Sequence, residues 1–265
     1  MARSKQVTKA GLAYNEGDMS QVSAVMDKPE RFRMSEMGYA GLNVFNGVTK
    51  DEIKRELQWP TCIKTYKQMS YHSSIAAPLT LYENIIGKSD FKFVAPEKAT
   101  EEELNQTRIM QEMLSDLDQP FSEVIREILT MNVYGFSVHE KVFRKRLKSN
   151  GSLYNDGLIG LKKIAYRNQD SIEKFIFSDT GNEIIGVKQN LTQVLDHYNR
   201  YSKRTEKEVI LPRSKFMLFV SGRDKGSPFG ISLLRDAYLS WRYLTAIEEL
   251  ESLLISKDLS GVPVN

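Results

Sequence analysis

The chain has 265 residues, of which 41% are hydrophobic and 27% are charged, which are ordinary values for one or two soluble domains. Its net charge of +3 is too small to indicate nucleic-acid binding, so only a local cluster of basic residues would point to that function. The sequence shows neither a secretory signal nor an apolar run of about eighteen residues, and we therefore expect a protein without a membrane segment, made and used in the cytoplasm or in something assembled there.

Residues 1–50 differ in composition from the rest of the chain. They contain few apolar runs and scattered Gly, Ser, Asp and Lys. We expect an extended arm, which is either a disordered tail or a segment that orders against a neighbouring subunit.

The next part of the chain predicts two helices followed by a hairpin. A short helix over 51–58 ends before Pro60, because the residue before proline disfavours the α conformation. Apolar residues at three- and four-residue spacing predict a second helix over 61–77. Strands are expected over 80–86 and 91–94, on either side of a glycine turn.

A capping box and an apolar stripe predict two further helices. Thr100 followed by Glu103 is the capping pattern for a helix that runs to about Leu117. A helix starting near Pro120 follows. The residues expected to face inward are Leu104, Met110, Met113, Leu114 and Leu117 in the first helix, and Phe121, Val124, Ile125, Ile128 and Leu129 in the second.

From Phe136 onward the apolar period changes to two, which indicates strands. Helices followed by strands and then by a long helix predict an α+β fold, with a β meander packed on the helices, rather than a wound parallel sheet. That last helix is expected to be capped by Ser232 and to run to about Lys257. The expected strands are 137–146, 158–167, 173–178, 184–189, 209–211 and 216–220.

The residues that catalysis or metal binding requires do not occur together. Gly87-Lys88-Ser89 is the end of a phosphate-binding loop, but the position of its first glycine is Tyr82. The three histidines, His72, His139 and His197, lack metal-ligand spacing. Cys62 is the single cysteine and has no histidine nearby in sequence, and Asp116 and Asp118 are expected to be solvated. We therefore predict no catalytic residue, no metal and no cofactor, and a protein that is not an enzyme.

Two basic stretches are the candidates for nucleic-acid binding, because phosphate contacts need mobile cations. A solvated hairpin edge, where lysines block unwanted strand pairing, is the simpler explanation and the one we favour. A further charged loop and one tryptophan are candidates for a subunit interface. The nucleic-acid candidates are Lys141, Arg144, Lys145, Arg146, Arg200, Lys203 and Arg204, and the interface candidates are Arg223, Asp224, Lys225 and Trp241.

Four segments together resemble the portal proteins of tailed bacteriophages, most closely the Mu-like type. They are LPRSKF at Leu211–Phe216, PFGISLLRDAYLSW at Pro228–Trp241, YGFSVHEKVF at Tyr134–Phe143, and the strand pair that begins at Arg167. These are packing and turn motifs, so their order and spacing carry the resemblance, which extends from 61 to about 265.

The resemblance implies a homo-oligomeric ring, expected to be a dodecamer, at one vertex of the capsid in the virion. Its implied partners are the major capsid protein, the terminase, head–tail adaptor or neck proteins, and double-stranded DNA passing through the channel during packaging and ejection. On this interpretation 1–50 is an arm, 51–231 is the wing domain and 232–265 is a long helix leading toward the stem. The family's clip, second stem helix and crown have no counterpart in this chain. A head–tail adaptor ring protein and a small DNA-processing enzyme subunit are the alternatives.

Overall fold

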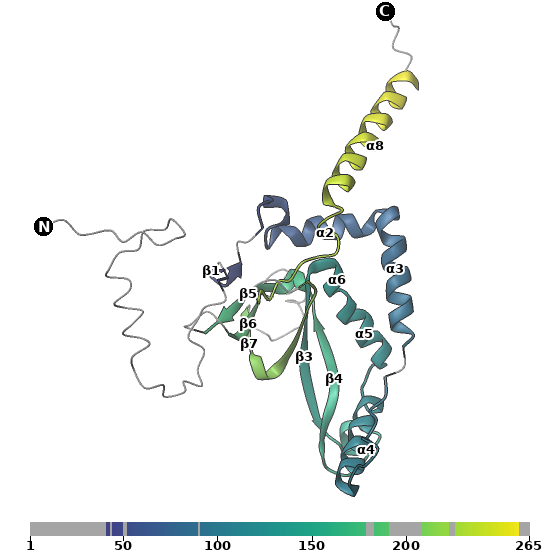
Figure 1. Ribbon diagram of the computed structural model, residues 1–265, viewed down its shortest axis with the longest axis vertical. Helices are drawn as coiled ribbons and strands as arrows, with labels where there is room; N and C mark the ends of the chain where they lie inside the picture. Colours follow the sequence, from purple (N-terminus) through teal and green to yellow (C-terminus); the bar gives the residue numbers. More distant parts are fainter. Residues whose placement is uncertain are drawn as a thin grey trace, which may run out of the picture. The chain divides into compact units, whose positions relative to one another are not determined.

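The computed structural model of the chain describes residues 41–42, 44–49, 52–89, 91–178, 183–190, 208–222 and 226–259 (Figure 1). These residues form helices and antiparallel sheets, which confirms the predicted α+β class. The helices are α2 (Thr61–Tyr71), α3 (Ser73–Gly87), α4 (Glu101–Ser115), α5 (Phe121–Leu129), α6 (Met131–Tyr134) and α8 (Tyr238–Leu259), with short 3-10 turns η1 (Arg55–Leu57), η2 (Lys148–Asn150), η3 (Gln169–Ser171) and η4 (Arg213–Lys215).

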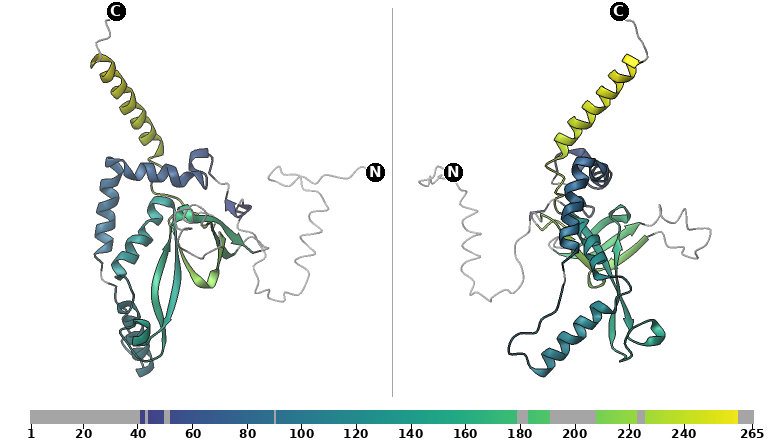
Figure 2. Two further views of the ribbon diagram at one scale, coloured as in Figure 1. Left: turned by 180° about the vertical axis from the view of Figure 1, so that it is seen from behind. Right: turned by 90° about the vertical axis from the view of Figure 1, so that its right-hand side faces the viewer.

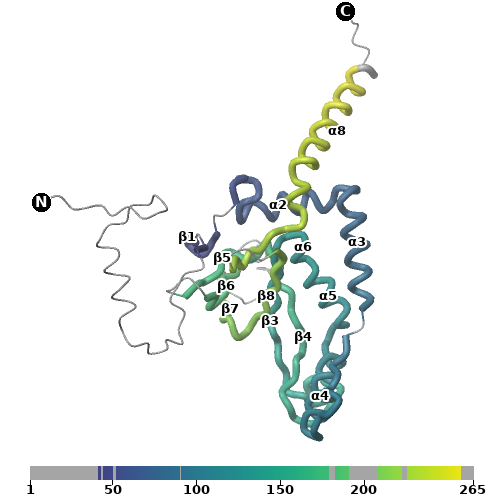
Figure 3. Tube along the Cα trace, viewed as in Figure 1, coloured from purple at the N-terminus to yellow at the C-terminus, as the bar shows by residue number. Residues whose placement is uncertain are grey.

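The strands form two three-stranded sheets and a small hairpin, not one meander. All pairs are antiparallel, in the orders β4-β3-β8 and β5-β6-β7, and β8 returns to pair with β3 (Figure 3). The predicted strands from 137 to 220 are therefore confirmed individually, and only their arrangement was wrong. The strands are β1 (Val44–Phe45), β2 (Val48–Thr49), β3 (Phe136–Lys145), β4 (Ile159–Arg167), β5 (Ile172–Phe177), β6 (Ile184–Asn190), β7 (Glu208–Pro212) and β8 (Phe216–Val220).

The region 52–94 differs most from expectation. The first predicted helix shrinks to the single turn η1. The second ends at Tyr71, because His72 adopts an extended conformation (φ −69°, ψ 130°), and α3 then continues through Pro78 to Gly87. Residues 80–86 are therefore helical, and 91–94 form no strand.

Helices α4 and α5 form as predicted, with one correction. The capping box is present, since Thr100 Oγ1 accepts the Glu103 N–H at 3.4 Å and Glu103 Oε2 accepts the Thr100 N–H at 2.8 Å. In α5 the stripe is inward, with Val124 and Ile125 buried. In α4, by contrast, Leu104 and Met110 are about half exposed and lie away from any core. Helix α4 lies beside the far end of the β3–β4 hairpin, as both views in Figure 2 show.

Two hydrophobic clusters hold the described residues together, and Trp59 packs against both of them. Its indole N–H donates to the Glu173 carbonyl at 3.1 Å, and its ring contacts Phe136 and Phe229. The helical cluster comprises Leu57, Cys62, Ile63, Tyr66, Met69, Val133, Leu234 and Tyr238. The sheet cluster comprises Phe136, Val138, Ile172, Phe175, Val187, Leu211, Phe216 and Phe229.

Candidate subunit interface

Among the described residues, the apolar contacts of helix α8 with the rest of the chain lie near its beginning. Tyr238 is buried in the helical cluster, and Trp241 packs against the same cluster. Farther along, the described contacts are polar: Arg242 pairs with Glu56 at 3.5 Å and Glu248 with His72 at 3.7 Å. Trp241, predicted at a subunit interface, thus contacts its own chain, and its role between subunits stays a prediction.

The segment before α8 is fixed by hydrogen bonds to distant parts of the chain. The Ser232 hydroxyl donates to the Val133 carbonyl and accepts the Leu234 N–H at 3.0 Å. Ser232 therefore caps a set of turns over 233–237, and α8 begins at Tyr238 instead of directly after the serine.

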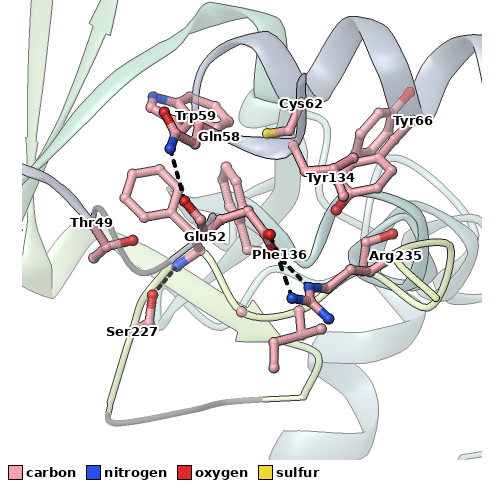
Figure 4. Close-up of a pocket in the computed structure, with 15 residues that line it drawn as sticks. Thr49, Glu52, Gln58, Trp59, Cys62, Tyr66, Tyr134, Phe136, Ser227 and Arg235 are labelled. Atoms are coloured by element: carbon pink, nitrogen blue, oxygen red, sulfur yellow. Dashed lines mark hydrogen bonds and ion pairs between the residues drawn. The ribbon is translucent and has the colours of Figure 1, made fainter. Parts of the chain in front are cut away.

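A pocket of about 270 Å³ lies between this segment, α2 and the residues before η1 (Figure 4). Inside it the Glu52 carboxylate faces the Arg235 guanidinium, with Oε2 2.6 Å from Nε, and the Glu52 carbonyl accepts from the Gln58 amide at 2.8 Å. Burial alone would raise the pKa of Glu52, but the Arg235 hydrogen bond and charge and the backbone N–H groups of residues 53 and 54 hold it below its usual value.

The other polar groups of the pocket are not activated for chemistry. Burial raises the pKa of the Cys62 thiol to about 12 and raises the pKa of the Tyr66 hydroxyl as well. Both groups are therefore protonated near neutral pH, and a thiol in that state is a poor nucleophile. The Glu52–Arg235 pair in this pocket connects the segment before α8 to the residues before η1.

Beyond its anchored beginning, α8 exposes a continuous apolar stripe. Helical residues three and four apart lie on one side, and seven residues of this spacing form what we call the α8 stripe. Its six large side chains are between 47% (Leu239) and 69% (Tyr243) exposed. The contacts to the same chain, through Trp241 and Glu248, come from the opposite side of the helix. The stripe consists of Leu239, Tyr243, Ala246, Ile247, Leu250, Leu253 and Leu254.

Helix α3 exposes a second apolar face. Ile75 and Leu79 pack on the helical cluster. The other side, which we call the α3 stripe, comprises Pro78, Leu81, Tyr82 and Ile85 and is exposed, with Leu81 at 63% and Ile85 at 64%. The expected strand over 80–86 hid this face, although Pro78, Leu81, Tyr82 and Ile85 have helical three- and four-residue spacing.

The first predicted basic cluster is divided by the fold. Arg144 and Arg146 are buried, with side chains 8% and 0% exposed. Arg144 Nη1 lies 2.8 Å from Asp118 Oδ1, and the Arg146 guanidinium stacks over Tyr154, 4.3 Å from the ring centroid. A guanidinium enclosed by carboxylates cannot reach a phosphate, so within this cluster the DNA-contact prediction now concerns Lys141, which is half-buried, and Lys145, which is exposed.

Asp116 was expected to be solvated but is 2% exposed. Its carboxylate accepts from the Ser152 hydroxyl at 2.8 Å and from the Leu153 N–H at 2.7 Å, and it lies 3.2 Å from Arg144 Nη2. Burial raises the pKa of Asp116, but these hydrogen bonds and the arginine outweigh it and lower the pKa below its usual value. Asp116 is thus an ionised anchor for the loop after β3, a role no local sequence signal indicates.

His139 is fully buried in β3, while Glu140 faces the other way and pairs with Arg167, as the strand period predicts. The centroid of the His139 ring lies 5.4 Å from that of the Tyr166 ring and 5.6 Å from that of the Phe219 ring. Neither ring nitrogen has a hydrogen-bond partner among the described residues, and burial lowers the pKa of His139 to about 4.

The remaining predicted residues lie outside the described part of the chain: Arg200, Lys203, Arg204, Arg223, Asp224 and Lys225. Within the described part, no group of three or more His, Cys, Asp or Glu side chains is placed to hold a metal ion. None of the helices there combines the length and apolarity that crossing a membrane requires.

The sequence model of one family, described as the portal protein of Mu bacteriophage, matches residues 63–247. The matched range includes both three-stranded sheets, helices α3 to α6 and the first half of α8. The search of curated proteins found no match.

Proposed function

Because the chain belongs to the family of Mu-type phage portal proteins, we propose that it is a structural subunit of the portal ring at one vertex of the capsid. In this role it forms part of the channel for genome packaging and ejection, and it docks the major capsid protein, the terminase and head–tail adaptor or neck proteins. A dodecamer is the proposed stoichiometry, with 51–231 as the wing and α8 leading toward the stem.

Beyond family membership, the observation that supports this proposal is the α8 stripe. Monomeric proteins rarely expose continuous apolar patches of this extent, and such patches mark interaction sites. A ring subunit needs long helices and β platforms that contact neighbours, and it does not need a reactive pocket. The pocket beside Glu52 and Arg235, with its protonated thiol, agrees with a structural role.

Electron microscopy of the purified full-length product tests the proposal, and rings with a central hole are the expected result. Leu250→Glu places a charge in the α8 stripe and should give monomers. Ser252→Glu is the matched control, because it places the same charge on the opposite side of α8, and it should keep the rings. Monomers of the unaltered protein under all conditions would overturn the proposal.

Contact with the translocating DNA is a separate part of the proposal and concerns Lys141, Lys145 and the basic residues of 200–204. Phosphate contacts weaken with salt, and each lost contact lowers the slope of log affinity against log salt by about one. Lys145→Gln in assembled rings should therefore reduce DNA affinity and its salt dependence, whereas Lys64→Gln on α2 should not. Equal behaviour of the two variants would remove Lys145 from the channel.

A further inference from the structure

The described residues carry two separate apolar helix faces that no other described residue covers, the α3 stripe and the α8 stripe. We propose that they are the two halves of one contact: the α8 stripe of one copy packs on the α3 stripe of the next copy. This inference rests on the proposed ring function and names the surfaces that build the ring.

The α8 stripe exposes enough apolar area for one side of a stable contact, and the smaller α3 stripe would cover part of it. The six large side chains of the α8 stripe, each about half to two-thirds exposed, present on the order of 700 Å², close to the roughly 800 Å² that one partner contributes to a standard interface. The stripe from Leu239 to Leu254 spans about 22 Å of helix, and the α3 face from Ser74 to Ile85 spans about 17 Å. The two faces are thus similar in length and can pack side by side.

The charges around the two stripes favour this pairing. Among its fifteen residues α3 contains a single charged side chain, Glu83, which is on the half-buried side. Loss of charge is typical of the centre of an interface. The small side chains of Ser74 and Ala77 lie at the edge of the α3 stripe, so the Leu and Ile side chains of α8 can approach the α3 backbone closely.

Pairing α8 with another α8 explains less. If two α8 stripes met, Glu251 at the border of each would face its own copy, and the α3 stripe would remain exposed. If the stripe of one α8 met the back of the next, it would bury the Glu248 carboxylate and compete with its pairing to His72, which is costly. The residues on that back are Thr245, Glu248, Ser252 and Ser256, together with the apolar Trp241, Leu244 and Ile255.

A contact between two different surfaces has a structural consequence. A self-complementary surface closes as a two-fold dimer, whereas a head-to-tail contact repeats around a ring or along a filament. Packing α8 on α3 therefore covers both exposed faces in every copy of a closed ring, and leaves one of each uncovered in a free monomer.

Cysteine cross-linking tests the proposal. Leu81, Tyr82 and Ile85 are replaced by cysteine one at a time, and Leu250→Cys is introduced in a separately tagged copy. Because a disulfide requires Cα atoms within about 7 Å, at least one of these three helical positions should be in reach. The native Cys62 is buried and stays unreactive. The two copies are mixed, assembled into rings and oxidised. The yield of covalent heterodimer should be several times that of a control pair in which the tagged copy carries Ser252→Cys instead of Leu250→Cys.

The outcomes separate this inference from the proposed function. If rings form and no α3 position cross-links above the Ser252 control, or if cross-links join α3 to α3, the pairing is overturned while the ring function stands. If the unaltered chain forms no rings, the proposed function fails first. Circular dichroism and thermal unfolding of each single variant show that the fold is intact, as expected for substitutions at exposed positions.

Discussion

The Nη2 atom of Arg146 lies 2.6 Å from the Oε2 atom of Glu112, and no part of the Arg146 side chain is exposed. The same nitrogen lies 3.0 Å from Asp156 Oδ2. These contacts join the end of β3 to α4, across 34 residues of sequence, and to the loop before β4. Removing one partner of a buried ion pair leaves the other charges uncompensated.

Arg146→Gln should therefore lower the free energy of unfolding by about 3 kcal/mol. The adjacent Lys145 is exposed, and Lys145→Gln should change stability by less than about 0.5 kcal/mol. Urea denaturation of the two variants measures the difference. Equal effects would contradict the structural role assigned to Arg146.

His139 should make the protein sensitive to mild acid. With a pKa of about 4 in the folded protein and 6.5 as its ordinary value, the folded state binds fewer protons than the unfolded state below about pH 6.5. Stability should thus be lost as the pH falls from about 6.5 toward 4. The contribution of His139 to this loss between pH 7 and pH 5 is about 2 kcal/mol.

The variant His139→Phe isolates this effect, because phenylalanine keeps an aromatic ring beside Tyr166 and Phe219 and does not titrate in this range. Chemical denaturation at the two pH values should show a smaller acid-induced loss in the variant than in the parent. An identical loss in both would show that the acid sensitivity between pH 7 and pH 5 does not come from His139.

Gly135 should tolerate no side chain. Its φ is +90°, its carbonyl accepts the Ser221 N–H at 2.8 Å, and a Cβ there would lie 2.3 Å from the Phe229 carbonyl oxygen. Gly135→Ala should cost at least about 2 kcal/mol, because the clash adds to the backbone strain. Gly151 is the control, because its φ is +75° but a Cβ there would meet only the end of the Arg144 side chain, at 3.9 Å. Gly151→Ala should therefore lower the free energy of unfolding by only about 1 kcal/mol. Thermal denaturation of the two variants measures the difference.

The ion pair between Glu52 and Arg235 should contribute modestly and in a salt-dependent way. Their side chains are 19% and 43% exposed, so Arg235→Gln should cost about 1 kcal/mol at low ionic strength and less at high salt. Arg242→Gln, which removes the more exposed pair with Glu56, should have a smaller effect. A cost independent of salt would show that Arg235 acts through packing instead of charge.

Local patterns in the sequence were sufficient for much of the fold. The apolar period of two and the turns between strands predicted the bounds of β3 to β8 within a residue or two. The capping pair Thr100 and Glu103 predicted the first residue of α4. Each of these signals acts between neighbours in sequence. The family resemblance, which the match to 63–247 confirms, came from the same local motifs read in order.

Helix α3 was misassigned because a short apolar run such as 79–86 fits a strand and a buried helix equally well. Pro78 favoured ending the preceding helix, yet α3 continues through it. The break at His72 is not marked by a glycine or proline at that position, so no local signal in the sequence predicts it.

The ion network was not predictable because its partners are far apart. From the sequence, Arg144 and Arg146 were interpreted as surface charges. In the fold they are buried beside Asp116 and Glu112, which lie at the end of α4. Likewise Glu52 meets Arg235 across 183 residues. The candidate interface was only partly foreseen: the long last helix and Trp241 were predicted, but the exposed face of α3 required the correct assignment of that helix.

The pairing of β8 with β3 has a consequence during translation. Strand β3 can join β4 as soon as that hairpin leaves the ribosome, but its other edge stays open until β8 has been made, roughly 50 residues later. At roughly 5–20 residues per second this delay is about 3–10 s. Throughout it, the nascent polypeptide presents an unpaired strand edge, so this is the interval in which chaperone capture or mispairing between neighbouring nascent chains would occur.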